Sequence, residues 1–120
     1  MRTMKQNGIL YDILGENECG FLLRMRNEHP VYQGHFPGNP ITPGVLTLQM
    51  VRECLSHLIG RELRYSAIKN CRFVAMVQPG DTLRLTLQSE KLDDIVKLKA
   101  SLCGSINPED MRLQLDADLQ

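Results

Sequence analysis

The stretch TPGVLTLQMVRECLSHLIG, residues 42–60, predicts one long helix that decides the fold. Thr42 can cap its start, Pro43 suits a first helical position that needs no N–H, and Gly60 suits the residue that ends it. Apolar side chains cover most of the circumference, which is typical of a buried helix. They are Val45, Leu46, Leu48, Met50, Val51, Cys54, Leu55, Leu58 and Ile59. The remaining narrow polar stripe is formed by Gln49, Arg52, Glu53 and Ser56.

Most of the remaining chain alternates between apolar and polar residues with a period of two, which predicts β-strands. We expect strands over 20–27, 66–77, 82–90, 94–105 and 111–119. An antiparallel sheet with one apolar face would bury that face on the single helix, so the predicted fold class is α+β. Residues 1–120 are expected to form a single domain.

Two segments before the helix give weaker patterns. Residues 8–14, GILYDIL, fit either a short strand or a helical turn. Residues 28–43 contain several Pro and Gly and predict a loop.

The composition excludes some classes of function. Fourteen basic and fourteen acidic residues cancel, which argues against a nucleic-acid binder. No apolar run approaches the roughly 20 residues of a membrane span, and no secretory signal is visible, so we expect a cytoplasmic protein with no membrane association. The four cysteines lack the close spacing of a metal or redox site, so no metal or other cofactor is expected.

Two motifs carry a resemblance to a known family. The first, HFPGNPITPGVL at residues 35–46, resembles the active-site motif of the 3-hydroxyacyl-acyl-carrier-protein dehydratases of fatty-acid synthesis. The second, FVAMVQPGDTL at residues 73–83, resembles another signature of that family. One position departs from the pattern, because the family's acidic residue fourteen positions after the histidine is Gln49 here.

The resemblance implies a hotdog fold, in which a curved antiparallel sheet wraps around one long central helix. It implies dimers formed through the sheets, sometimes assembled further, with the histidine of one subunit facing the helix acid of the other. It also implies a thioester substrate carried on acyl carrier protein or coenzyme A.

Dehydration of a 3-hydroxyacyl thioester requires a base, a donor to the enolate-like oxygen, and an acid for the departing hydroxyl. His35 is the predicted base, since a neutral imidazole is available near neutral pH. Gly44 is the predicted oxyanion donor, because backbone N–H groups in a first helical turn lack internal partners. Gln49 occupies the acid position, although an amide does not release a proton.

Three replacements for the missing acid remain open. Glu53 lies one helical turn beyond Gln49, although it can equally pair with Arg52 or with solvent. His35 can act as both base and acid. Alternatively, a related subunit supplies the acid in a heterodimer.

Other residues are candidates for binding. We expect an acyl tunnel beside the helix, or else plain core packing, to be formed by Phe36, Ile41, Val45, Phe73 and Met76. Four basic residues either bind an acidic carrier protein or are simply exposed to solvent, namely Arg24, Arg26, Lys69 and Arg72. His29 is expected to be exposed or to have a capping role in its loop. His57 lies near the helix C-terminus, where the helix dipole favours a cation.

We therefore expect a hydro-lyase that reversibly converts 3-hydroxyacyl thioesters to trans-2-enoyl thioesters in fatty-acid or related lipid or polyene synthesis. Because Gln49 replaces the family's acid, two alternatives to this activity remain open. One is an acyl thioesterase on the same fold, and the other is a catalytically impaired partner subunit of a heterodimeric dehydratase.

Overall fold

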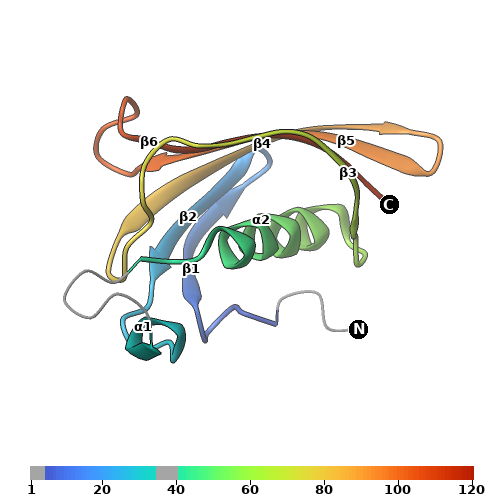
Figure 1. Cartoon of the computed structure of the whole chain (residues 1–120). Coiled ribbons are helices and arrows are strands. Elements are labelled where there is room, and N and C mark those ends of the chain that lie inside the picture. Colours follow the sequence, from blue (N-terminus) through green and yellow to red (C-terminus); the bar gives the residue numbers. More distant parts are fainter. Residues whose placement is uncertain (1–4, 35–40) are drawn as a thin grey trace.

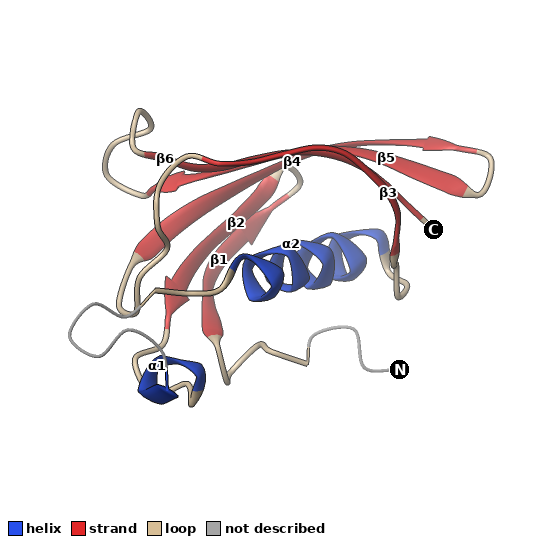
Figure 2. Cartoon of the chain, in the orientation of Figure 1, coloured by secondary structure: helices blue, strands red, loops and turns tan. Residues whose placement is uncertain are grey.

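A curved antiparallel sheet arches over one long helix (Figure 1). The computed structural model describes residues 5–34 and 41–120. The strands are β1 Tyr11–Asn17, β2 Gly20–Met25, β3 Tyr65–Phe73, β4 Thr82–Leu92, β5 Ile95–Gly104 and β6 Met111–Leu119. Their order in the sheet is β1-β2-β4-β5-β6-β3. The helices are the short α1 Val31–Gly34 and the long α2 Gly44–Ile59, which lies on the concave side of the sheet (Figure 2).

Helix α2 matches its prediction except at its first turn. Pro43 is the N-cap residue and Gly44 the first helical residue, so the prediction of Thr42 as the cap is wrong. The Thr42 hydroxyl instead pairs with that of Tyr32 at 2.7 Å, which holds α1 against the start of α2. Gly60 ends the helix with φ of 92° and donates its N–H to the Ser56 carbonyl, as predicted for a left-handed terminal residue.

The predicted strands are present, with shifted ends. The second half of the ambiguous segment 8–14 is the start of strand β1. The short helix α1 interrupts the loop predicted over 28–43. The strand predicted over 66–77 ends at Phe73. Beyond it, the N–H of Val74 bonds to the Arg112 carbonyl and the Val77 carbonyl accepts from Thr42, so the chain leaves the sheet toward α2.

The sheet buries one face against α2, as the alternating pattern predicted. Leu83, Leu85 and Leu87 of β4 are buried while Arg84 and Gln88 are exposed. Burial also raises the pKa of the Cys54 thiol on α2 to about 12, so this cysteine packs as an uncharged side chain. In the described part of the chain, neither helix has the length and apolar character needed to cross a membrane.

Gly20 supports a sharp prediction about the fold. A Cβ on Gly20 would collide with the Leu85 carbonyl group of β4, which is backbone and cannot swing aside. Gly20→Ala should lower the free energy of unfolding by about 1–3 kcal/mol, as overpacking of a rigid site does. Gly15→Ala is the matched control, since its added Cβ meets nothing within 4 Å. Urea unfolding of both variants measures the difference, and equal stabilities would contradict the assigned packing of β2 on β4.

Candidate active site

A pocket of about 310 Å³ lies between the first turn of α2 and the segment that follows β3. Its lining is Ile41, Thr42, Gly44, Thr47, Phe73, Val74, Ala75, Met76 and Val77. The two recognised motifs supply all of these residues except Thr47. The structure therefore brings together Gly44 with three of the five predicted acyl contacts, Ile41, Phe73 and Met76.

The Phe73 ring lies directly on the first turn of α2. A Cβ on Gly44 would sit 2.8 Å from Phe73 Cζ, so only glycine lets the ring approach this closely. No side chain of the described residues caps the helix start. The N-terminal end of the helix thus presents backbone polarity to an otherwise apolar pocket.

Val45 and Phe36 do not join this group. Val45 is 72% exposed and does not line the pocket, because one helical residue turns its side chain about 100° away from Gly44. Phe36 and the predicted base His35 lie outside the described residues.

Arg112 on β6 holds the far wall of the pocket. Its Nη1 donates to the Met76 carbonyl at 2.9 Å and to Asp81 Oδ2 at 2.6 Å, and its Nη2 and Nε donate to Asp110. The two carboxylates raise the pKa of the guanidinium above its usual range. Asp81 also accepts the N–H of Gln78, so Arg112 and Asp81 tie the 74–81 segment to the sheet.

Glu53 lies inside the protein, with none of its surface exposed. Its Oε1 accepts the Tyr11 hydroxyl and the N–H of Gln6, both at 2.9 Å. Its Oε2 accepts Nε2 of Gln49, also at 2.9 Å. Burial above all, with Cys54 and Glu53 nearby, raises the pKa of Tyr11, so its phenol remains a donor.

This burial excludes the two non-catalytic roles that the sequence suggested for Glu53, pairing with Arg52 or with solvent. Arg52 does not pair with it, since Arg52 donates to the Leu63 carbonyl at 3.0 Å. Solvent does not reach it either, so both alternatives considered from the sequence are wrong. Gln49 lies between Glu53 and the outside, and a substrate contacting this part of α2 would meet the amide first.

Gly44 and Gln49 face different sides of α2. Five residues of helix correspond to about 140° of rotation and about 7.5 Å of rise. Accordingly, Gly44 faces Phe73 at the end of β3, whereas Gln49 is bonded to Glu53 beside β1. Strands β3 and β1 are the two edges of the sheet, so one chain does not place both groups around one small substrate.

The other predicted residues have ordinary roles. His29 Nδ1 accepts the Val31 N–H at 3.1 Å and so caps α1, as expected. His57, in the last turn of α2, pairs with Glu16 at 3.2 Å. Arg24 lies on β2 and Arg26 directly after it, while Lys69 and Arg72 lie on β3, so the four basic residues do not form one docking patch within a chain.

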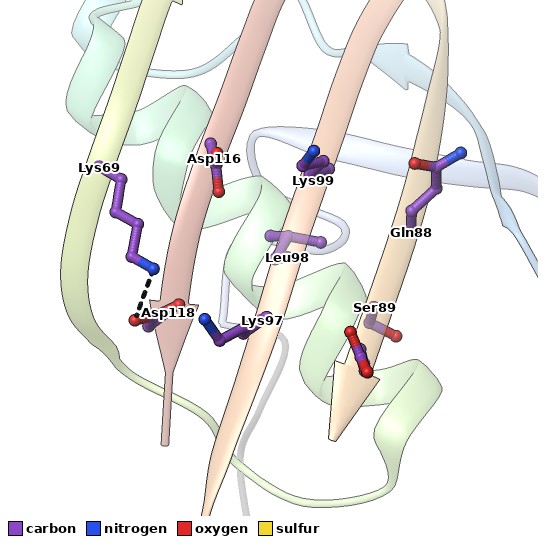
Figure 3. Close-up of a pocket in the computed structure, with 9 residues that line it drawn as sticks. Lys69, Gln88, Ser89, Lys97, Leu98, Lys99, Asp116 and Asp118 are labelled. Atoms are coloured by element: carbon purple, nitrogen blue, oxygen red, sulfur yellow. Dashed lines mark ion pairs between the residues drawn. The ribbon is translucent and has the colours of Figure 1, made fainter. Parts of the chain in front are cut away.

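A larger hollow of about 420 Å³ lies on the outer face of the sheet (Figure 3). Its side chains come from β3, β4, β5 and β6 and are mostly charged, with Lys69 paired to Asp118 at 3.5 Å. It contains none of the predicted catalytic residues and faces away from α2. The smaller pocket at the start of α2 is therefore the candidate active site.

Comparison with known proteins assigns the chain to a family. The ApeI-like family model, described as ApeI dehydratase, matches residues 13–105 of the 120. The chain belongs to the ApeI-like dehydratase family. The match covers the pocket, α2 and the Gln49–Glu53 pair.

Relatives of known name support the resemblance seen in the motifs. The chain is 41% identical over 85 residues to the 3-hydroxyacyl-acyl-carrier-protein dehydratase FabZ of Chloroflexus aggregans, covering 65% of this chain and 58% of the relative. It is 42% identical over 67 residues to the FabZ of Lactiplantibacillus plantarum, covering 50% and 46%. These alignments therefore span about half the length of the relatives.

Solved structures confirm the hotdog fold of this ApeI-like chain. The dehydratase heterocomplex ApeI:P from Xenorhabdus doucetiae matches with a TM-score of 0.64 at 21% identity, covering 86% of this chain and 88% of that one. The Escherichia coli PaaI protein matches with a TM-score of 0.70 at 16% identity, covering 98% and 86%. At these identities the likeness establishes the fold alone.

Some residues of the site were missed from the sequence. Thr47 is a polar residue on an apolar helix face, and that mismatch is the signal that it lines a pocket. Tyr11 and Arg112 left no local signal, because their partners Glu53 and Asp81 are 42 and 31 positions away.

Arg112 gives a prediction about the pocket wall. Arg112→Ala removes the bonds to Asp81, Asp110 and the Met76 carbonyl, and should lower the free energy of unfolding by about 1.5–3 kcal/mol. Binding of an acyl thioester should weaken as well, because Met76 loses its anchor. Arg84→Ala is the control, since Arg84 is exposed on the outer face. Urea unfolding and calorimetric titration measure the two effects, and parity with Arg84→Ala would rule out the assigned role.

Proposed function

We propose that this chain is a 3-hydroxyacyl thioester dehydratase subunit, which reversibly removes water to form a trans-2-enoyl thioester. The observation that carries the proposal is the pocket, in which an apolar wall from the second motif meets the glycine-started helix of the first. An acyl chain suits the apolar side chains of Ile41, Phe73 and Met76. The thioester carbonyl suits the first turn of α2 at Gly44.

The reaction assigns a role to each remaining group. His35, at the head of the first motif, removes the proton next to the thioester carbonyl, and the N–H groups of the α2 first turn stabilise the resulting oxyanion. Gln49 contacts the 3-hydroxyl as a hydrogen-bonding group. The proton that the departing hydroxyl needs comes from His35, which returns the one it removed, or from an acid on a partner subunit.

Two chains are needed for a complete site. The opposite orientation of Gly44 and Gln49 on α2 supports a dimer in which the pocket of one chain meets the Gln49 side of another helix. Both a homodimer and a heterodimer with a related hotdog subunit satisfy this geometry. The family match and the FabZ relatives support acyl carrier protein as the carrier of the thioester. We further propose that the protein acts in the cytoplasm.

Thioester hydrolysis is the competing reaction on this fold. A hypothetical thioesterase from Streptococcus pneumoniae, solved with coenzyme A, is 9% identical, which supports the shared fold and not a shared reaction. Both motifs of this chain favour the dehydratase. The two reactions are distinguished in one sample, because hydrolysis releases a free thiol whereas dehydration changes the absorbance of the enoyl thioester.

Replacement of His35 tests the proposal. His35→Ala should lower kcat/KM for hydration of a trans-2-enoyl thioester by about 10²–10⁴-fold, the range for loss of a general acid–base group. The assay is run on the chain alone and on its mixture with a related subunit that carries an acid at the helix position. His57→Gln is the control, because His57 pairs with Glu16 in the last helical turn. Full activity of His35→Ala in both assays would exclude the mechanism.

A further inference from the structure

The hydrogen bond that Gln49 offers a substrate depends on the orientation of its amide. A carboxamide has an acceptor oxygen on one side and a donor NH₂ on the other. Nε2 of Gln49 donates to Glu53 at 2.9 Å, and among the described residues Oε1 of Gln49 accepts no hydrogen bond. The amide is therefore held with its nitrogen toward the protein and its oxygen away from Glu53.

Glu53 is itself fixed more firmly than a surface carboxylate. Tyr11 and the Gln6 backbone donate to its Oε1, which leaves Oε2 to accept from Gln49. These partners come from the N-terminal segment, from β1 and from α2, so three separate parts of the chain meet at this buried side chain. Since Glu53 is fully buried, it acts on a substrate only through Gln49.

We propose that Glu53 is a positioning residue that turns the Gln49 carbonyl oxygen toward the substrate, so that α2 presents a hydrogen-bond acceptor to the 3-hydroxyl group. This inference rests on the proposed function. A 3-hydroxyacyl thioester has a hydroxyl donor at this position, whereas a 3-oxoacyl thioester has only an acceptor. The arrangement therefore selects for hydroxylated substrates during binding.

Replacement of Glu53 by glutamine reverses the orientation with almost no change of shape. The introduced amide must use its oxygen to accept from Tyr11 and Gln6, so its NH₂ faces Gln49. The Gln49 amide then has to turn over, because only its oxygen can accept that bond. In the double variant Gln49→Glu/Glu53→Gln, the carboxylate at position 49 accepts from the amide at position 53 with one oxygen. It presents its other oxygen outward, which restores the acceptor.

The orientation is measured directly by NMR of the side-chain amide. In the wild type, the two Gln49 NH₂ protons should be well separated in shift and slow to exchange, and Glu53→Gln should move them. Their resonances are assigned by their loss in Gln49→Leu. Glu90→Gln, which alters an exposed carboxylate on β4, is the matched control and should leave them in place. Rapid exchange and coincident shifts of the Gln49 protons in the wild type would overturn the proposal.

Binding measures the effect on selectivity. The probes are two non-hydrolysable pantetheine thioethers, one with a 3-hydroxyl on its chain and one with a 3-oxo group, whose oxygen accepts hydrogen bonds but donates none. The wild type should prefer the hydroxylated probe by about two- to twelve-fold, the contribution of one hydrogen bond. Glu53→Gln should lose this preference and the double variant should regain it, whereas a merely structural role of Glu53 would weaken both probes equally.

The outcomes separate this proposal from the function on which it rests. An unchanged ratio of the two affinities in Glu53→Gln would overturn the positioning role. If the Gln49 NH₂ protons of the wild type exchange slowly but neither probe binds, the proposed function is wrong. The orientation of the Gln49 amide would in that case still be supported by its slow exchange.

Discussion

The buried carboxylate of Glu53 is the constraint on which the arrangement of this chain depends. A polar group inside a protein must be bonded within it, since unpaired burial costs several kcal/mol by transfer or about 1–3 kcal/mol by mutation. Glu53 meets this requirement through Tyr11, Gln6 and Gln49, which draws β1 and the N-terminal segment onto α2. The position of the N-terminal segment and the orientation of the helix amide are thus set by one side chain.

The same rule governs the rest of the polar stripe of α2. Ser56 is fully buried and its hydroxyl accepts the Leu63 N–H, while Arg52 donates to the Leu63 carbonyl. Tyr65 adds a bond to the Leu48 carbonyl at 2.7 Å. These contacts fix the turn between α2 and β3, and β3 in turn brings Phe73 to the first turn of the helix. The pocket is therefore positioned by contacts at both ends of α2.

How much of this the sequence could predict follows from the range of each interaction. Helix α2 beyond its first turn, the strand alternation of β4 and the left-handed Gly60 depend on neighbours in sequence, and all three were predicted correctly. The motifs also placed Ile41, Gly44, Phe73 and Met76 at one pocket. The burial of Glu53 has no such local signal, because a carboxylate in a polar stripe has the same pattern whether it faces water or a distant tyrosine. The exposure of Val45 has no local signal either, since apolar residues at the start of a helix look alike whether they face the core or the outside.

The pair of Gln49 and Glu53 also explains why an amide is compatible with this helix. A carboxylate at position 49 would lie within hydrogen-bond reach of a buried carboxylate, and two like charges so close raise the pKa of at least one of them. Such a pair needs a shared proton to persist, whereas glutamine donates to Glu53 without one. The family's acid position and the buried Glu53 are therefore coupled, and a change at either one alters the chemistry of the other. The amide is matched to its buried neighbour, and the proton that it does not supply has to come from His35 or from across a subunit interface.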